Sequence, residues 1–225
     1  MEKKPPVFSS EKILELIKER RSVRSFTGKK IAHEDILSII ESGLWAPTGC
    51  NNQELKFLIL DKQEEIEEIM EFKPSFRGVS HAILLFCDMS LFMSRKMYVE
   101  NKSEKHLPYI DAGLALENMI LYAKSKGIDS CIFNLSEHHF KKAQPNRNLI
   151  EKISSKVKVK AGFYKSVKEN FEFYLRKRLK LSESFKILCG VALGYSKNFP
   201  NVRSDSHGWN KLMRESVDNH IIKRD

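Results

Sequence analysis

An arginine-rich stretch near the start of the chain carries side chains suited to binding an anion. The sequence ERRSVRSF places three arginines and two serines within residues 19–26. Guanidinium groups bind phosphate oxygens in pairs, and neighbouring hydroxyl groups can donate to the same oxygens. The alternative is a solvated helix end, where positive side chains interact favourably with the helix dipole. Composition alone favours this second interpretation.

A second stretch, GLWAPTGCNNQEL at residues 43–55, places three amide side chains next to each other after a turn. Pro47 ends a predicted helix, because proline disfavours helical geometry in the residue before it. The amides precede an apolar run, and each can both donate and accept hydrogen bonds to a ligand. Trp45 is expected in the core at the helix end or near an interface, and Cys50 is expected to be accessible. No role for Glu54 is evident from the pattern.

The composition indicates a folded chain without structural metal or disulfide sites. It has 225 residues, 41% of them hydrophobic, and its four cysteines are scattered without a CxxC pair. Three of them lie in apolar stretches, which is typical of buried thiols in a reducing compartment. No signal peptide opens the chain, and no run approaches the roughly 20 apolar residues of a membrane span. We therefore expect a cytoplasmic protein with no membrane association and no metal.

Hydrophobic periodicity predicts helices and strands in one continuous domain. We expect a helix at 9–22 with Ser10 as its N-cap, and a long helix at 108–129 with Gly127 as its C-cap. The other predicted helices cover 34–45, 63–72, 166–178 and 208–217, and the predicted strands cover 55–61, 81–88, 130–135 and 186–195. We interpret residues 1–225 as a single domain with an insertion at about 137–180.

The net charge of +10 is concentrated in one segment of the chain. Residues 141–186 hold 14 lysines or arginines and 4 aspartates or glutamates, so they alone carry +10 and the remainder is neutral. Aromatic side chains lie between these charges, as in proteins that follow a nucleic-acid backbone. The same composition also suits an acidic or phosphorylated substrate, or a solvated helix. A nucleic-acid-binding module is therefore an alternative to an enzyme.

Taken in order along the chain, the motifs resemble those of the nitroreductase family of FMN-dependent oxidoreductases. That family opens with Arg-(Arg/Lys/His)-Ser-(Val/Ile)-Arg-x-Phe, which is matched by residues 20–26. A helix ending in Ala-Pro-Ser-x-x-Asn-x-Gln follows, matched by Ala46, Pro47, Thr48, Asn51 and Gln53. The family's middle helix is matched by Asp111, Gly113, Asn118, Leu121, Ala123, Gly127 and Ile128, and a late strand reads ALGY. The resemblance covers roughly residues 11–135 and 179–203.

The resemblance implies an α+β nitroreductase-like fold, with a central mixed, mainly antiparallel β-sheet flanked by helices. It also implies a homodimer with the long central helix at the interface and FMN bound between the subunits. Arg20 and Ser22 would then bind the phosphate and ribityl chain, and Arg24 would approach the pyrimidine edge with Arg21 in support. The remaining implied contacts are a loop of the partner subunit with Pro47, Thr48, Asn51 and Gln53, backbone groups of Phe133, Asn134 and Leu135, and Arg203 at the phosphate.

The implied reaction is a ping-pong hydride transfer from NADH or NADPH through FMN to a small acceptor, such as a nitroaromatic compound or a quinone. Flavin N5 carries this chemistry, so no catalytic side chain is expected. Because the family shares its cofactor site across chemistries, reductive dehalogenation is an alternative. Two features depart from the family pattern. Glu54 and Leu55 replace the usual Pro-aromatic pair, and the 137–180 segment is longer and more basic.

Overall fold

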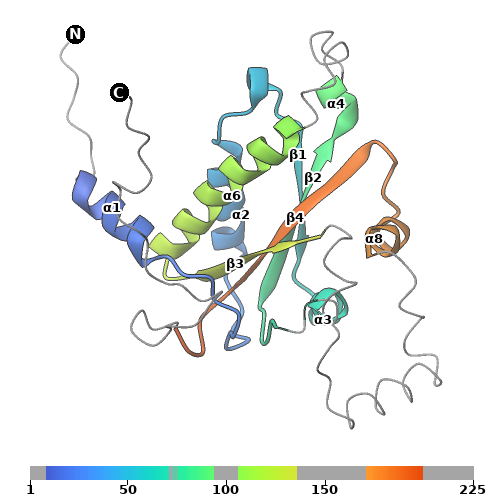
Figure 1. The fold of residues 1–225 in the computed structure, drawn as a ribbon. Coiled ribbons are helices and arrows are strands. Elements are labelled where there is room, and N and C mark those ends of the chain that lie inside the picture. The colour runs from blue at the N-terminus through green and yellow to red at the C-terminus, as the bar shows by residue number, and fades with distance from the viewer. Residues whose placement is uncertain (1–8, 71–72, 74, 94–105, 136–170, 200–225) are drawn as a thin grey trace, which may run out of the picture.

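The computed structural model describes residues 9–70, 73, 75–93, 106–135 and 171–199, which form one sheet with helices on both faces (Figure 1). The predicted helix at 208–217, Arg203 and most of the basic 137–180 insertion lie outside the described residues. None of the helices in the described part of the chain is long and apolar enough to cross a membrane.

The sheet has four strands in the order β1-β2-β4-β3, and each pair of neighbours is antiparallel. The strands are β1 (Leu55–Leu60), β2 (His81–Asp88), β3 (Asp129–Asn134) and β4 (Phe185–Gly194). Within the described ranges, parallel pairing occurs only in the isolated bridges Ser22–Ser130 and Ser25–Arg77. The α+β class and the four predicted strands are confirmed, and the described sheet is antiparallel.

Strand β2 is buried on both faces because its side chains alternate between two hydrophobic cores. Ile83 and Leu85 belong to one core, whereas Leu84 and Phe86 belong to the other. Successive side chains of a strand point to opposite faces of a sheet, so a strand covered on both faces needs a continuous apolar run. This is why HAILLFC contains no alternating polar residues. The short helix α4 (Met89–Met93) follows directly.

Helices α2 (His33–Leu44) and α6 (Leu107–Ser125) cover one face of the sheet and pack against each other. Helix α6 ends in a Schellman motif around Gly127, whose φ is 72°. The N–H of Gly127 donates to the carbonyl of Lys124, and the N–H of Ile128 donates to the carbonyl of Ala123, both at 2.9 Å. The C-cap is Lys126, and Gly127 follows it in the left-handed conformation that ends the helix.

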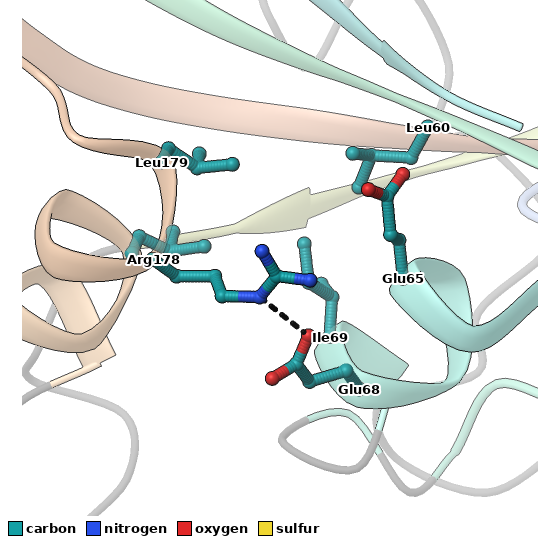
Figure 2. Close-up of a pocket in the computed structure, with 7 residues that line it drawn as sticks. Leu60, Glu65, Glu68, Ile69, Arg178 and Leu179 are labelled. Atoms are coloured by element: carbon teal, nitrogen blue, oxygen red, sulfur yellow. Dashed lines mark hydrogen bonds and ion pairs between the residues drawn. The ribbon is translucent and has the colours of Figure 1, made fainter. Parts of the chain in front are cut away.

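Helices α3 (Gln63–Met70) and α8 (Phe171–Leu179) cover the opposite face. The predicted helix at 166–178 is described from Phe171 onward. Figure 2 shows the shallow pocket between α3 and α8, where Arg178 Nε lies 3.2 Å from Glu68 Oε2. The apolar lining of the pocket comes from Leu60, Ile69 and Leu179. The pocket therefore lies at the contact between two helices, which the ion pair of Arg178 and Glu68 joins.

Helix α1 (Ser10–Glu19) lies at the edge of the molecule beside α6 and buries none of its residues. Its N-cap is Ser9, whose hydroxyl accepts from the N–H of Lys12 at 3.3 Å. The assignment of Ser10 as the cap is therefore wrong. A cap needs extended backbone geometry, which Ser9 has and which Ser10, as the first helical residue, does not.

Apolar side chains on α1, α2 and α6 face away from the described core. On α6, Ile110 is 54% exposed and Leu114 is 42% exposed, with Gly113 between them. A Cβ at Gly113 would meet open space. Trp45 is 81% exposed as the C-cap of α2, so its expected core position is wrong. We call Ile110, Gly113, Leu114 and Glu117 the outer face of α6.

Gly190 on β4 lies against the ring of Phe133, and a side chain there should destabilise the fold. An added Cβ would lie 2.7 Å from Phe133 Cε2 and 3.0 Å from Leu84 Cδ2. Gly190→Ala should lower the free energy of unfolding by about 1–3 kcal/mol, the usual effect of overpacking a core. Urea denaturation measures this change. The substitution should cost less in a Phe133→Leu background, and an equal cost in both backgrounds would contradict the packing account.

Candidate functional site

The segment 20–26 leaves α1 and runs alongside the start of β3. The N–H of Val23 donates to the carbonyl of Ser130 at 3.0 Å. Val23 is buried and anchors the segment, whereas Ser22 and Arg24 on either side of it are exposed. The alternation of the extended chain therefore presents these two polar side chains to solvent.

Arg20, Ser22 and Arg24 lie in the segment beside the start of β3, where their side chains act on the thiol of Cys131. Burial raises the pKa of this thiol, and Arg24, the Ser22 hydroxyl and Arg20 act in the opposite direction. Together with the bridge between Ser22 and Ser130, these effects place the three side chains at the start of β3. We call Arg20, Ser22 and Arg24 the arginine cluster. Two guanidinium groups and a hydroxyl group at one strand form a set of donors suited to a phosphate.

Arg21 points elsewhere and stabilises the end of α1. Its Nη1 donates to the carbonyl of Arg20 at 2.8 Å and also to the carbonyl of Lys18. These contacts use carbonyl groups that the end of a helix leaves without partners inside the helix. Arg21 is therefore placed to support the backbone of the arginine cluster, and the structure does not bring its side chain into that cluster.

Strand β3 continues from the arginine cluster, and its side chains alternate between core and surface. Phe133 is 4% exposed and Leu135 is 1% exposed, both within the core under α3 and α8. The Phe133 ring contacts the Phe76 ring edge-on, with 5.7 Å between centroids. Asn134, between Phe133 and Leu135, is exposed. Phe133 and Leu135 can therefore reach a ligand only through their backbone groups.

The loop 47–53 contains the short 3-10 helix η1 (Gly49–Asn51) and an unusual backbone. Cys50 and Asn51 both have φ of 53°, and Gln53 has φ of 54°. Positive φ is uncommon for residues other than glycine, and three such residues in one short loop indicate a shape that the surroundings impose. Such conformations cluster at ligand-binding sites.

Hydrogen bonds hold this loop and orient its amides. The N–H of Asn51 donates to the carbonyl of Thr48 at 2.9 Å, and the N–H of Gln53 donates to Thr48 Oγ1 at 3.1 Å. Asn51 and Gln53 are exposed together with Pro47, whereas Asn52 is half-buried. Two amides are thus offered to solvent and the third points inward.

One carboxylate on α6 ties the loop to the central helix. The N–H of Gly49 donates to Oδ2 of Asp111 at 3.1 Å, and Asp111 is only 3% exposed. The sequence analysis matched Asp111 to the middle helix of the family and did not indicate this contact. The Asp-x-Gly pattern at 111–113 is a signal that could have indicated it.

The loop 47–53 and the arginine cluster lie toward opposite ends of α6 (Figure 1). Asp111 lies in the first turns of α6, whereas Ser22 is paired with Ser130, which comes just after α6 ends. At 1.5 Å per residue, the path from Asp111 to the end of α6 is roughly 20 Å. Within one chain, the described residues therefore do not bring the loop and the cluster together.

A family model and several known proteins are similar to this chain. A model described as the nitroreductase family matches residues 17–75. A Methanothermobacter thermautotrophicus protein, provisionally named NADH dehydrogenase/NAD(P)H nitroreductase, is 27% identical over 119 residues, which are 52% of this chain and 57% of that protein. An Archaeoglobus fulgidus protein with the same provisional name is 26% identical over 167 residues, which are 72% of this chain and 91% of that protein. This chain thus spans little more than half of the first relative and most of the second.

A solved structure supports the assignment of the fold. A provisionally named nitroreductase from Desulfovibrio desulfuricans, in complex with FMN, has a TM-score of 0.57 and 20% identity, over 91% of this chain and 96% of that chain. The sheet and its covering helices thus define an α+β protein of the nitroreductase fold. The matched residues 17–75 include both the arginine cluster and the loop 47–53, so this part of the chain is similar to the nitroreductase family.

Proposed function

We propose that this chain is an FMN-dependent oxidoreductase that takes hydride from NADH or NADPH and reduces a small acceptor, such as a nitroaromatic compound or a quinone. The observation that carries this proposal is the arginine cluster at β3, within the residues that match the family model. The FMN in the Desulfovibrio desulfuricans structure and the NAD(P)H in the names of the two relatives support the cofactor and the reductant.

The residues of the arginine cluster suit the two ends of FMN. Arg20 and Ser22 would hold the phosphate and ribityl chain, and Arg24 would lie at the pyrimidine edge of the ring. A positive charge at that edge stabilises negative charge on the ring and raises its reduction potential. Bound FMN supplies the hydride-accepting atom, so the chain needs no nucleophile of its own. The cluster holds hydroxyl and guanidinium groups, which fits this division of roles.

The backbone of β3 is proposed to lie along the ring. The side chains of Phe133 and Leu135 occupy the core. The strand can therefore contact the ring through their backbone groups and through the exposed Asn134. Arg203, outside the described residues, is proposed to close on the phosphate.

A second copy of the chain is proposed to complete the site with its loop 47–53, through Pro47, Thr48, Asn51 and Gln53. Two observations support a homodimer. The loop and the arginine cluster are about 20 Å apart along α6, too far for both to hold one end of FMN in a single chain. The outer face of α6 is apolar at Ile110 and Leu114 and has no covering group among the described residues. Two antiparallel copies of α6 would bring each loop to the cluster of the other chain.

The described part of the basic segment gives no support to the alternative of a nucleic-acid module. Arg178 is paired with Glu68 at 3.2 Å. Arg176 Nη2 donates to the carbonyl of Phe185 at 2.7 Å. Both cations therefore hold α8 in place. A surface that binds a nucleic-acid backbone instead needs its cations for contacts with phosphates.

The proposal is tested with the purified chain after incubation with FMN. We expect the chain to retain FMN and its colour. NADH or NADPH should bleach this colour in the absence of oxygen, and a nitroaromatic compound or a quinone should restore it. A chain that retains no FMN but binds oligonucleotides with steep salt dependence would contradict the proposal. Recovery of colour with a halogenated aromatic compound alone would favour reductive dehalogenation.

A further inference from the structure

Glu54 is fully buried at the start of β1, directly after the loop 47–53. Its exposed fraction is 0%, and the N–H of Asp88 donates to its backbone carbonyl at 2.9 Å, which fixes the residue at the end of the sheet. Among the described residues, neither side-chain oxygen has a hydrogen-bond partner of good geometry. A charged carboxylate is strongly unfavourable in such a place. The side chain therefore needs either a proton or a partner.

The group that faces Glu54 is another buried carboxyl, that of Asp111 on α6. Burial, followed by the Asp111 side chain, raises the pKa of Glu54 from 4.5 to about 7, while its own backbone and the Asn52 amide act in the opposite direction. Two carboxyl groups that share one water-poor site do not both ionise readily. A proton on Glu54 removes the repulsion and gives Asp111 a donor.

Asp111 connects this pair to the loop 47–53. Its Oδ2 accepts from the N–H of Gly49 at 3.1 Å, at the start of η1. The next two residues, Cys50 and Asn51, adopt the positive φ values of the loop. The position of the Asp111 carboxylate therefore affects the backbone that presents the exposed amides of Asn51 and Gln53.

We propose that Glu54 carries a proton when FMN binds, donates it in a hydrogen bond to Asp111, and through this pair positions the loop 47–53. Loss of the proton places two negative charges in contact, and their repulsion moves Asp111 away from the N–H of Gly49. Glu54 is a positioning residue in this arrangement, because it acts on the cofactor only through Asp111 and the loop. The inference rests on the proposed FMN site.

The other ionisable groups around the pair come from β2 and β4. Burial, and next Glu54, raise the pKa of Cys87 to about 12, so this thiol stays neutral near neutral pH. The hydrogen bond from Ser90 lowers the pKa of Asp88, so this carboxylate stays charged there. Lys186 places its amino group 4.3 Å from the centroid of the Tyr109 ring. An effect of pH near neutrality on the loop is therefore expected to come from the pair and not from Cys87 or Asp88.

The first test compares FMN affinity in the wild type and in Glu54→Gln by fluorescence titration at about pH 6 and about pH 8.5. Glutamine keeps a donor toward Asp111 at every pH. We expect the wild type to lose about tenfold in affinity relative to Glu54→Gln between these pH values, because one proton is linked to binding. The phosphate of FMN itself titrates near pH 6, so the difference between the two proteins is the readout. Glu64→Gln changes an exposed carboxylate on α3 and should follow the wild type.

The second test follows the thermal unfolding of the cofactor-free chain as a function of pH. Folding raises the pKa of Glu54 from 4.5 to about 7, so the folded chain binds this proton more tightly than the unfolded chain. Its contribution to stability is therefore complete below about pH 4.5 and is lost as pH rises to about 7. The Tm of the wild type should fall across this window more steeply than the Tm of Glu54→Gln.

The outcomes separate this inference from the proposed function. If both proteins bind FMN with the same pH profile, the positioning role is overturned and the proposed function stands. If the wild type binds no FMN at any pH, both are overturned, and the unfolding profile still reports whether Glu54 holds the proton. If Glu54→Gln does not fold, Asp111→Asn replaces it, since it removes one charge and keeps an oxygen for Gly49. That variant should also show a flat profile, and a wild-type profile in it would overturn the inference.

Discussion

Arg20→Ala is expected to weaken FMN binding by about 1.5–3 kcal/mol, or roughly 10- to 150-fold in Kd, the worth of one hydrogen bond to a charged group. Arg20 is half-buried at the end of α1, and its charge acts on the pKa of Cys131 on β3. A phosphate bound at the arginine cluster would lose a charge-assisted hydrogen bond in this variant. Fluorescence titration with FMN measures the change.

Two further variants separate loss of binding from loss of fold. Arg21→Ala removes the contact of Nη1 to the carbonyl of Arg20 at 2.8 Å, and should lower stability with a smaller effect on FMN. Arg178→Ala removes a cation between α3 and α8, where it is paired with Glu68 at 3.2 Å, and should leave FMN affinity unchanged. The phosphate role of Arg20 is wrong if Arg20→Ala binds FMN as tightly as the wild type.

Ile110→Glu is expected to convert a dimer into monomers and to abolish tight FMN binding. Ile110 is 54% exposed on the outer face of α6, so within one chain the substitution disturbs little. In a two-fold interface it occurs twice, and the lost burial of about 1.5–3 kcal/mol per copy weakens association roughly a hundredfold or more. Size-exclusion chromatography with light scattering measures the assembly, and the same sample is titrated with FMN.

Gln63→Glu is the matched control, since it adds the same charge at an exposed position on α3. It should remain a dimer with normal FMN affinity. A monomeric Ile110→Glu that binds FMN like the wild type would show that one chain holds the whole site. A dimeric Ile110→Glu would place the interface elsewhere.

Much of the fold was predictable from local patterns, and the exceptions have long-range causes. The apolar run at 81–88 became β2 because a strand covered on both faces needs no polar alternation. The helix expected at 9–22 ends at Glu19, because the following residues leave it to pair with β3 at Ser130. Periodicity has no information about such a partner, nor about the exposure of Trp45, which depends on what covers the end of α2.

The candidate site was predictable as two stretches of sequence and not as an arrangement. The arginine cluster forms where segment 20–26 lies beside β3, and these two stretches are far apart in the sequence. The role that we propose for Glu54 depends on Asp111, because the two carboxyl groups are both buried and act on each other. The sequence alone shows only a carboxyl group directly after three amides. A single sequence shows the types of these side chains but does not show that they meet.

Subunit exchange between two defective variants tests most directly whether FMN lies in a site built from two chains. Arg20→Ala alters the arginine cluster, and Asn51→Ala alters the loop that the second chain would supply. After the two purified variants are mixed and allowed to exchange, half of the dimers are mixed, and one of the two sites in each mixed dimer is free of substitutions. We predict that about a quarter of all sites regain wild-type FMN affinity and are bleached by NADH or NADPH. If no site regains that affinity although mixed dimers have formed, the site does not combine the two chains in this way and the account is contradicted.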